Sequence, residues 1–409
     1  MKLKSLLSVL YVSFLSIMAG LPSCVLAQTS SSEPIKIGMT TSLSGLNAAF
    51  GLSTRNGIEA YFNKINAEGG IGGHQIELVA LDDGYEPARA ASNMLQLIDK
   101  ENVLAVIGNA GTSTAAVTVP IADKKKVLLF GPLSGSDILR KNPPDRYVIN
   151  FRAGYDIEIP TMIKQLLANG VKPESIAFFT EKDQYGQAEY QAALAVLKNA
   201  GIAHPEKLLH VTYERNTLNV EGAVEGVLVQ DIYPDVFIIT GGYAPVARFI
   251  KLIKENLNDT VFLTISFVDP VVLTSALNGQ DGNVITTGVV PYLNSDLPAI
   301  NEYKTDIKKY NKDAELSYAS LEGYLIAKLF VMGLKQSIAD GKLSREGIID
   351  SFEKMKNIDL GIGSNSRISF SKTNHQALQT LWPSILKDHH PVPFDWKSIS
   401  KMVKKKELD

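Results

Sequence analysis

The sequence predicts an α/β protein with mostly parallel sheets, divided into two lobes. Apolar runs of strand length alternate with helical stretches along most of the chain, which is the pattern of parallel α/β folds. This series starts again after Arg152. The chain has 409 residues, of which 45% are hydrophobic and 21% charged, so it is too long for one small core and too apolar to be disordered.

The first series of elements ends near residue 135. Apolar residues with helical spacing fill 55–70, and this helix stops at the pair Gly69-Gly70. The strand "VLAVIGN" passes into glycine and small hydroxyl residues before the next helix begins. The predicted strands are 35–43, 74–83, 103–109 and 126–135, and the predicted helices are 55–70, 86–101 and 114–125.

The second series is followed by a tail that does not continue the same alternation. The predicted helices of this series are 159–170, 188–201, 220–230 and 244–257, and its predicted strands are 175–183, 209–214, 234–242 and 260–269. The tail adds a strand at 283–292, helices at 297–311 and 320–338, and short strand signals at 366–372. Because these late helices have no series of their own, they must pack back on one of the lobes.

The amino terminus has the pattern of a secretory signal peptide. Lys2 and Lys4 precede the apolar run 6–21, and a polar segment follows it. A membrane anchor is the alternative, but it needs about 20 apolar residues, and serines interrupt this run. Cleavage after Ala27 fits a small-residue site, and a lipoprotein anchored through Cys24, which is the only cysteine, is the lesser alternative. We expect an exported, periplasmic protein without a disulfide.

The charge balance and the motifs exclude several classes of function. The chain has 41 basic and 43 acidic residues, so it lacks the basic surface that nucleic acids require. Its six histidines have no metal-ligand spacing, and no Walker pattern, no G-x-G-x-x-G after a strand and no G-x-S-x-G elbow occurs. We expect no cofactor, no metal and no enzymatic activity. A hydrolase using Ser113 or Ser134 is the enzymatic alternative, although neither serine has an evident histidine base.

Uncharged hydrogen-bonding groups follow two of the predicted strands. Thr112, Ser113 and Thr114 begin a helix, where unpaired amides and hydroxyls favour an anion, and Ser134 and Gly135 follow the next strand. Such residues are often only helix N-caps, but ligands of open α/β sheets bind beyond the carboxyl ends of strands. We therefore predict a site for a carboxylate or a similar group. Aromatic residues in comparable loops indicate a small-molecule pocket: Phe50, Tyr85, Tyr155, Tyr185, Tyr243 and Phe267.

A set of ordered segments carries a family resemblance. From about Pro34 onwards the chain contains "IKIGMTTSLSG", "AAFG", "GIEAYFNKINAEGGIGG", "LVALDDGYEPARA", "VIGNAGTSTA", "FGPLSG", "DQYG" and "GGY". Together these segments resemble the type I periplasmic solute-binding proteins of the branched-chain, or hydrophobic, amino acid ABC uptake family. None of the segments is decisive alone, but their collinear order is specific.

The resemblance implies two Rossmann-like lobes joined by three crossovers, with the ligand held between them. It places the crossovers near 152–155, 288–292 and 361–364. The expected division assigns residues 1–27 to the signal peptide, 28–152 and 293–360 to lobe I, and 153–292 and 361–409 to lobe II. The late helices would thus return to the first lobe.

In the family, two loops hold the carboxylate of an amino acid. By similarity, Thr112 binds it with its hydroxyl and amide, whereas Leu133 and Gly135 bind it with backbone atoms. Ser134 would replace the family's hydroxyl, displaced by one residue. Among the aromatic candidates, Phe50, Tyr185 and Tyr243 match family tyrosines near the ligand, and Tyr85 and Tyr155 are candidates from their loop positions alone.

One departure from the family concerns the ammonium group of the ligand. Where the amino-acid binders have a glutamate for this group, the chain reads Ser266, Phe267, Val268 and Asp269. Losing the carboxylate removes a charge-assisted hydrogen bond to an ammonium. Either Asp269 replaces it from three residues on, or the ligand carries no ammonium. The predicted ligand is therefore an amino acid or an aromatic or other organic acid.

The predicted function is capture of a small carboxylate-bearing solute and its delivery to an inner-membrane ABC permease. Hinge closure over the ligand would present the shape that the permease recognises, and we expect a monomer. A ligand-sensing partner of a membrane receptor or sensor kinase is the alternative, because the sequence alone does not distinguish the two.

Overall fold

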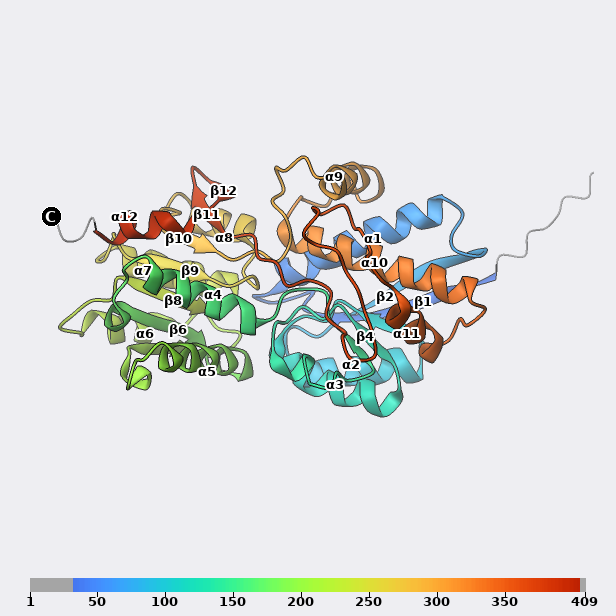
Figure 1. Ribbon diagram of the computed structural model, residues 1–409, viewed down its shortest axis with the longest axis horizontal. Helices are drawn as coiled ribbons and strands as arrows, with labels where there is room; N and C mark the ends of the chain where they lie inside the picture. The colour runs from blue at the N-terminus through green and yellow to red at the C-terminus, as the bar shows by residue number, and fades with distance from the viewer. Residues whose placement is uncertain (1–31, 405–409) are drawn as a thin grey trace, which may run out of the picture.

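The computed structural model describes residues 32–404 and contains two β-sheets that lie end to end, each with helices on its faces (Figure 1). The first sheet has the strand order β2-β1-β3-β4-β5, and all its pairs are parallel. The second has the order β12-β11-β10-β9-β8-β6-β7, in which β11 and β12 are antiparallel to their neighbours. The predicted α/β class, with parallel-type sheets in two lobes, is confirmed. The predicted signal peptide and Cys24 lie outside the described residues.

The central strands are buried along their whole length, as parallel strands covered on both faces are. The first sheet consists of β1 (Ser32–Thr41), β2 (His74–Asp82), β3 (Ala105–Ile107), β4 (Leu128–Phe130) and β5 (Val148–Ile149). The second consists of β6 (Ile176–Glu181), β7 (His210–Tyr213), β8 (Val236–Thr240), β9 (Val261–Thr264), β10 (Val284–Thr286), β11 (Ser384–Lys387) and β12 (His390–Pro393).

The helices cover both faces of each sheet. Around the first sheet lie α1 (Ala48–Ala67), α2 (Pro87–Asp99), α3 (Thr112–Lys125), α9 (Pro298–Tyr310), α10 (Tyr318–Ala339), α11 (Arg345–Lys354) and the short η1 (Asp137–Leu139). Around the second lie α4 (Tyr155–Ala168), α5 (Gln184–Asn199), α6 (Glu221–Leu228), α7 (Tyr243–Lys254), α8 (Pro270–Leu277), α12 (Ile399–Lys404) and the short η2 (Pro173–Ser175), η3 (Pro205–Lys207) and η4 (Trp396–Ser398). Within residues 32–404, no helix has the length and apolar character needed to cross a bilayer.

The late helices pack on the first lobe, where α10 lies beside α1 (Figure 1). The rings of Tyr61 on α1 and Tyr324 on α10 are 5.1 Å apart and meet edge to face. Lys64 of α1 also forms an ion pair with Glu302 of α9 at 2.6 Å. Aromatic contacts and this ion pair therefore fix a segment that the alternation of strands and helices could not place.

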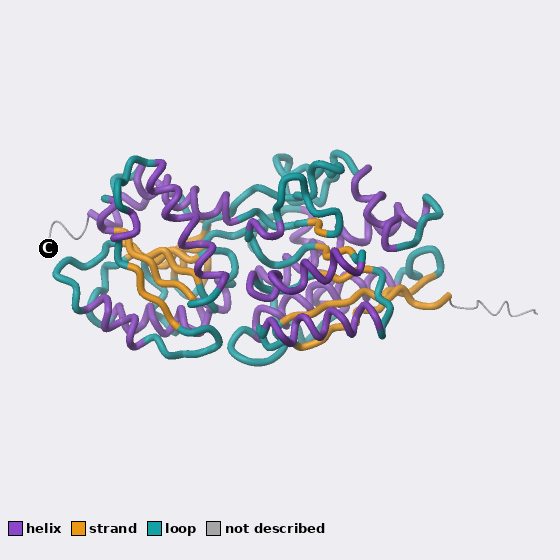
Figure 2. The backbone as a smooth tube through the Cα atoms, turned by 90° about the horizontal axis from the view of Figure 1, so that it is seen from below, coloured by secondary structure: helices purple, strands orange, loops and turns teal. Residues whose placement is uncertain are grey.

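Extended segments cross between the two groups of strands, which Figure 2 shows on either side of a central region of loops and helix ends. Gly288 and Trp382 exchange backbone hydrogen bonds of 3.0 and 2.8 Å, so the second and third crossovers lie side by side. The third crossover was expected near 361–364, and this position is wrong. The Asn150 amide donates to the His375 carbonyl at 2.8 Å, and the Leu378 amide donates to the Phe151 carbonyl at 2.9 Å, so the chain still contacts the first lobe there.

Candidate ligand-binding site

The loops at the carboxyl ends of the two parallel sheets meet between the lobes. This is the edge of open α/β sheets at which ligands bind. The hydroxyl of Ser113, in the first lobe, donates to Asp183 Oδ2 of the second lobe at 2.5 Å. Arg215 of the second lobe forms an ion pair with Glu86 of the first at 2.8 Å. The two edges are therefore in direct contact.

Thr112 and Ser134 form a buried hydroxyl pair in the first lobe. They follow the neighbouring strands β3 and β4, and their Oγ atoms are 2.7 Å apart. Ser134 Oγ also accepts from the Ser136 amide at 3.2 Å. Thr112 and Ser113 are the first residues of α3, so their amides have no carbonyl partner within the helix. The two loops predicted to hold a carboxylate thus come together, with hydroxyls and helix amides at one place.

The backbone of Leu133 is already paired. Its amide donates to the Asn109 carbonyl at 2.7 Å, and its carbonyl accepts from the Gly111 amide at 3.2 Å. Its side chain is fully buried. These bonds hold the loops after β3 and β4 together, so the Leu133 amide is already paired, and its predicted contact with the ligand stays a prediction.

Asp183 was not among the predicted site residues, although it opens the segment "DQYG". It is the N-cap of α5, and its Oδ1 accepts from the amides of Tyr185 at 2.9 Å and Gly186 at 3.2 Å. Its Oδ2 accepts from Ser113 across the lobe boundary. The second lobe therefore presents a carboxylate of its own to the start of α3.

Five aromatic side chains from both lobes form one buried group, which we call the aromatic cluster. The Phe267 ring centroid lies 4.6 Å from that of Phe50, 5.1 Å from Tyr185 and 5.9 Å from Tyr85. Tyr155 lies 6.0 Å from Tyr185. A pocket of about 10 Å³ lies beside Phe50, which is about the space that one water molecule needs. Five of the six predicted aromatic candidates are thus brought together.

Two glycines let tyrosines of this cluster lie against the loops that carry Thr112 and Ser134. A Cβ at Gly111, whose φ is +95°, would lie 2.2 Å from Cε2 of Tyr85. A Cβ at Gly135 would lie 2.3 Å from Cδ1 of Tyr155. The ring of Tyr85 therefore covers the residue before α3, and the ring of Tyr155 covers the Ser134 loop.

Several buried polar atoms in this region lack a partner. The hydroxyls of Tyr85 and Tyr185 have no hydrogen-bond partner within residues 32–404, although each residue is only 1% exposed. Glu189, one turn after Tyr185 on α5, is also 1% exposed and neither of its carboxyl oxygens has a partner in this part of the chain. Burial raises the pKa of all three groups well above the usual range, because it disfavours their charged forms. Buried polar atoms normally have partners, so Tyr85, Tyr185 and Glu189 are candidates for contacts with a ligand. The sequence did not single out Glu189.

Ser266 and Asp269 have structural partners. The amide and hydroxyl of Ser266 donate to the Glu158 carboxylate at 2.9 and 2.7 Å. Asp269 is the N-cap of α8, and its Oδ2 accepts from the Ala319 amide at 2.7 Å. Replacement of the family's glutamate by Asp269 is therefore not supported, and Phe267 is the residue of this turn that joins the aromatic cluster. Across the described residues, no group of three or more His, Cys, Asp or Glu is placed to hold a metal ion.

Tyr243 is not one of the rings of the aromatic cluster, and its predicted place near the ligand stays a prediction. It is the first residue of α7, is half-buried, and packs against the hydrophobic core of the second lobe. The loop that precedes α7 contacts another tyrosine, Tyr213, which the sequence did not single out. Its hydroxyl donates to Glu181 Oε2 at 2.5 Å and accepts from the Gly242 amide at 2.9 Å.

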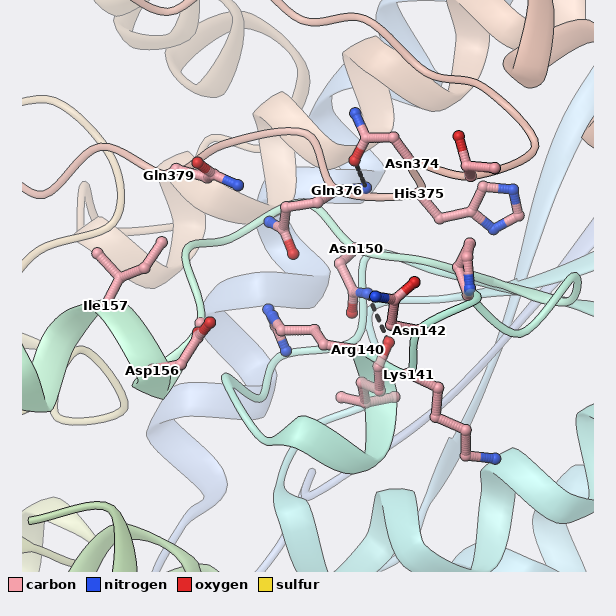
Figure 3. A pocket seen from close by; sticks show the side chains of 14 residues that line it. Arg140, Lys141, Asn142, Asn150, Asp156, Ile157, Asn374, His375, Gln376 and Gln379 are labelled. Atoms are coloured by element: carbon pink, nitrogen blue, oxygen red, sulfur yellow. Dashed lines mark hydrogen bonds between the residues drawn. The ribbon is translucent and has the colours of Figure 1, made fainter. Parts of the chain in front are cut away.

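Arg140 anchors the Ser134 loop and was also missed. Its guanidinium donates to the carbonyls of Ser134 at 3.0 Å, Ser136 at 3.1 Å and Arg152 at 2.9 Å, so it ties this loop to the first crossover. Burial lowers its pKa to about 10. Arg140 lies in a polar pocket of about 270 Å³, lined by its own loop, the start of α4 and the segment before the third crossover. Figure 3 shows the side chains that line it. Nothing in the sequence separates this arginine from a surface one.

A family model described as periplasmic binding protein matches residues 34–388. The chain belongs to the periplasmic binding protein family. A crystal structure of a possible leucine/isoleucine/valine-binding protein from Rhodopirellula baltica SH 1 is 35% identical to it, with a TM-score of 0.86 over 91% of this chain and 99% of that one. The resemblance to the type I, Leu/Ile/Val-binding type of this family is confirmed.

Curated relatives are more distant. The leucine-specific-binding protein of Salmonella typhimurium is 24% identical over 321 residues, which are 76% of this chain and 83% of that protein. An amino acid binding protein of Pseudomonas aeruginosa is 28% identical over 169 residues, or 41% of this chain and 44% of that protein. The match to that relative thus spans less than half its length. Family members of this kind are solute-binding proteins.

Proposed function

We propose that the protein captures a small carboxylate-bearing solute between its two lobes and delivers it to an ABC permease. The observation that carries this proposal is the pairing of Thr112 and Ser134 at the start of α3, where two hydroxyls meet helix amides that have no partner within the helix. Such a group is complementary to a carboxylate. The aromatic cluster next to it supplies apolar surface for the rest of a small ligand.

Capture requires the lobes to separate and close again. The connection between them consists of extended crossover segments, two of which lie side by side at Gly288 and Trp382. Across the site, Ser113 and Asp183 form a contact that breaks when the lobes move apart. Hinge opening would expose the start of α3 to solvent, and closure would surround the bound solute.

We further propose the division of the chain between the lobes. The first lobe comprises the described residues up to 152 and from 293 to about 378, and the second lobe comprises 153–292 and the residues after about 379. The hydrogen bonds from Asn150 and Phe151 to 375–378 support the later boundary.

We also propose that the protein is exported by a signal peptide, lies in the periplasm, is a monomer and has no enzymatic activity. These properties accompany solute capture.

The proposal is tested by thermal unfolding of the purified protein with single amino acids and aromatic acids. A solute that binds the folded state raises Tm in a concentration-dependent way. Thr112→Val removes one hydroxyl of the pair and is expected to weaken binding of that solute about tenfold, as loss of a hydrogen bond to a charged group does.

Thr118→Val is the matched control. Thr118 is buried in the same helix, and its hydroxyl has no partner within residues 32–404, so its replacement leaves binding unchanged. A protein whose Tm responds to no solute of either class would contradict the proposed function. Equal binding by Thr112→Val and Thr118→Val would contradict the place assigned to the carboxylate.

A further inference from the structure

Tyrosine rings cover both loops at which the solute carboxylate is proposed to bind. Tyr85 lies against Gly111, the residue before α3, and Tyr155 lies against Gly135, the residue after Ser134. The first group attached to a carboxylate at this place is therefore next to these two rings.

Two more rings of the aromatic cluster complete an enclosure around that place. The Tyr185 centroid lies 6.0 Å from that of Tyr155. The Phe267 centroid lies 5.1 Å from that of Tyr185 and 5.9 Å from that of Tyr85. Tyr85 comes from the first lobe and the other three rings from the second, so the rings touch in this closed arrangement and part when the hinge opens. A group that enters between them is enclosed by both lobes on closure.

Three carboxyl groups and one guanidinium lie on the Phe267 side of the cluster. The guanidinium is that of Arg152, and Glu322 binds it at 2.8 and 2.6 Å. Glu158 accepts from hydroxyls and an amide of uncharged residues, and Asp269 accepts from backbone amides at both of its oxygens. None of these hydrogen bonds comes from a cation, so this side of the cluster favours a positive charge on the ligand.

A further carboxylate faces the proposed place of the ligand's own carboxylate. Asp183 Oδ2 accepts from Ser113, the residue after Thr112. A carboxylate bound at the start of α3 therefore has a second carboxylate as its neighbour, and like charges placed side by side repel. A positive group next to the ligand's carboxylate offsets this repulsion. The charges thus favour a zwitterion over a simple acid.

Few strong acceptors remain here for the N–H groups of a primary ammonium. The oxygens of Asp183 already accept three hydrogen bonds from the protein. Glu181 and Glu189 have unpartnered oxygens among the described residues, but burial raises the pKa of both and so favours their protonated forms, which are weaker acceptors. A primary ammonium has three N–H donors, and on burial it would lose hydrogen bonds that it makes in water.

A quaternary ammonium avoids this loss because it has no N–H groups. Aromatic faces attract such a cation, and a cage of rings is how proteins recognise quaternary ammonium ligands. The tyrosine hydroxyls lie in the planes of their rings, so they do not stand between a ring face and the nitrogen above it. The aromatic cluster therefore matches a nitrogen that carries alkyl groups only.

We propose that the ligand is a betaine, an amino acid whose nitrogen is fully alkylated, and that the aromatic cluster is the cage for this nitrogen. The carboxylate lies at Thr112 and Ser134, and the nitrogen lies beside it, among Tyr85, Tyr155 and Tyr185. This inference rests on the proposed function and names the ligand class for the same site.

Isothermal titration calorimetry with four compounds tests the inference. Glycine betaine is compared with tert-butylacetate, which has the same shape but a carbon in place of the charged nitrogen. The other two compounds are glycine, which lacks the methyl groups, and L-leucine. We expect glycine betaine to bind roughly tenfold or more tightly than each of the other three. If any of the three binds as tightly as glycine betaine, the inference is overturned and the proposed function stands.

Native mass spectrometry separates the outcomes in which none of the four compounds binds. A retained carboxylate with a quaternary nitrogen then supports the inference. A different retained molecule overturns the inference and leaves solute capture in place. If no small molecule is retained, the result counts against both.

Variants of one ring test the cage. Tyr185→Leu removes an aromatic face and is expected to weaken the binding of glycine betaine roughly three- to tenfold, while tert-butylacetate binds as before. Tyr185→Phe keeps the ring and is expected to bind glycine betaine within about twofold of wild type. Tyr190→Leu is the control, because Tyr190 is on the same helix but stacks on His210. An equal loss for both compounds in Tyr185→Leu would overturn the cage, because the positive charge would then play no part.

Discussion

The ion pair between Arg152 and Glu322 joins the first crossover to α10, and it predicts a large effect of a small substitution. Arg152 is fully buried and Glu322 is 2% exposed, and two hydrogen bonds of 2.8 and 2.6 Å connect them. Glu322→Gln keeps the size of the side chain but leaves the Arg152 charge buried without its counter-charge. Breaking a buried pair in this way costs about 3–5 kcal/mol.

This cost converts to a measurable shift of Tm. The unfolding entropy is about 2.1 cal/mol/K per residue, or roughly 0.8 kcal/mol/K for the described part of the chain. Dividing the cost by this entropy gives a fall of Tm of roughly 4–6 °C, if the chain unfolds as one unit. Calorimetry and urea unfolding of wild type and Glu322→Gln measure the shift. Replacing both partners, by Arg152→Met with Glu322→Leu, is expected to recover most of the loss, because no charge is then left unpaired.

A surface pair supplies the matched control. Arg248 and Glu221 form an ion pair in which the side chains are 48% and 53% exposed. The same substitution there, Glu221→Gln, is expected to change stability by less than about 1 kcal/mol, since water screens exposed charges. Equal losses for Glu322→Gln and Glu221→Gln would refute the reasoning, because burial would then not determine the cost.

Two further predictions concern the site. Gly135→Ala places a methyl group 2.3 Å from the Tyr155 ring, so we expect calorimetry to show a lower Tm and titration to show a loss of ligand binding. In a Tyr155→Ala background the same change is expected to lower Tm clearly less. An equal loss of Tm in both backgrounds would contradict the contact. Burial raises the pKa of Glu181 to about 8, above its value in the unfolded chain. Between these two pKa values the folded state holds a proton that the unfolded state has lost. The free energy of unfolding therefore declines as pH rises from about 4.5 to 8. Glu181→Gln is expected to flatten this decline of Tm with pH, and an unchanged slope would show that Glu181 is not its source.

The fold and the meeting of the Thr112 and Ser134 loops were predictable because they depend on local and repeating patterns. Alternating apolar strands and helices gave the α/β class, and neighbouring strand ends brought Thr112 and Ser134 within 2.7 Å. The carboxyl edges of the two sheets face each other, which also explains why Phe50 and Tyr85 of the first lobe meet Tyr185 and Phe267 of the second.

The errors arose where a role depends on which partner a group finds. Asp269 has the residue type for an ammonium, but Pro270 follows it and its oxygens bind amides of α8 and α10. Tyr243 follows a strand like the other tyrosines, but it is the first residue of α7 and packs against the core of the second lobe, so residue type and position alone did not show its neighbours. The third crossover was misplaced because the hydrogen bonds that keep 375–378 on the first lobe form between irregular segments, which have no periodic pattern.

The central claim is that a solute carboxylate binds at the start of α3. A crystal structure of the protein with its retained or added solute tests this claim most directly. We predict a carboxylate within hydrogen-bonding distance of Thr112 Oγ1 and the first amides of α3, with the rest of the solute among Phe50, Tyr85, Tyr185 and Phe267. A solute bound elsewhere, or one that places a group other than a carboxylate at Thr112, would contradict the account.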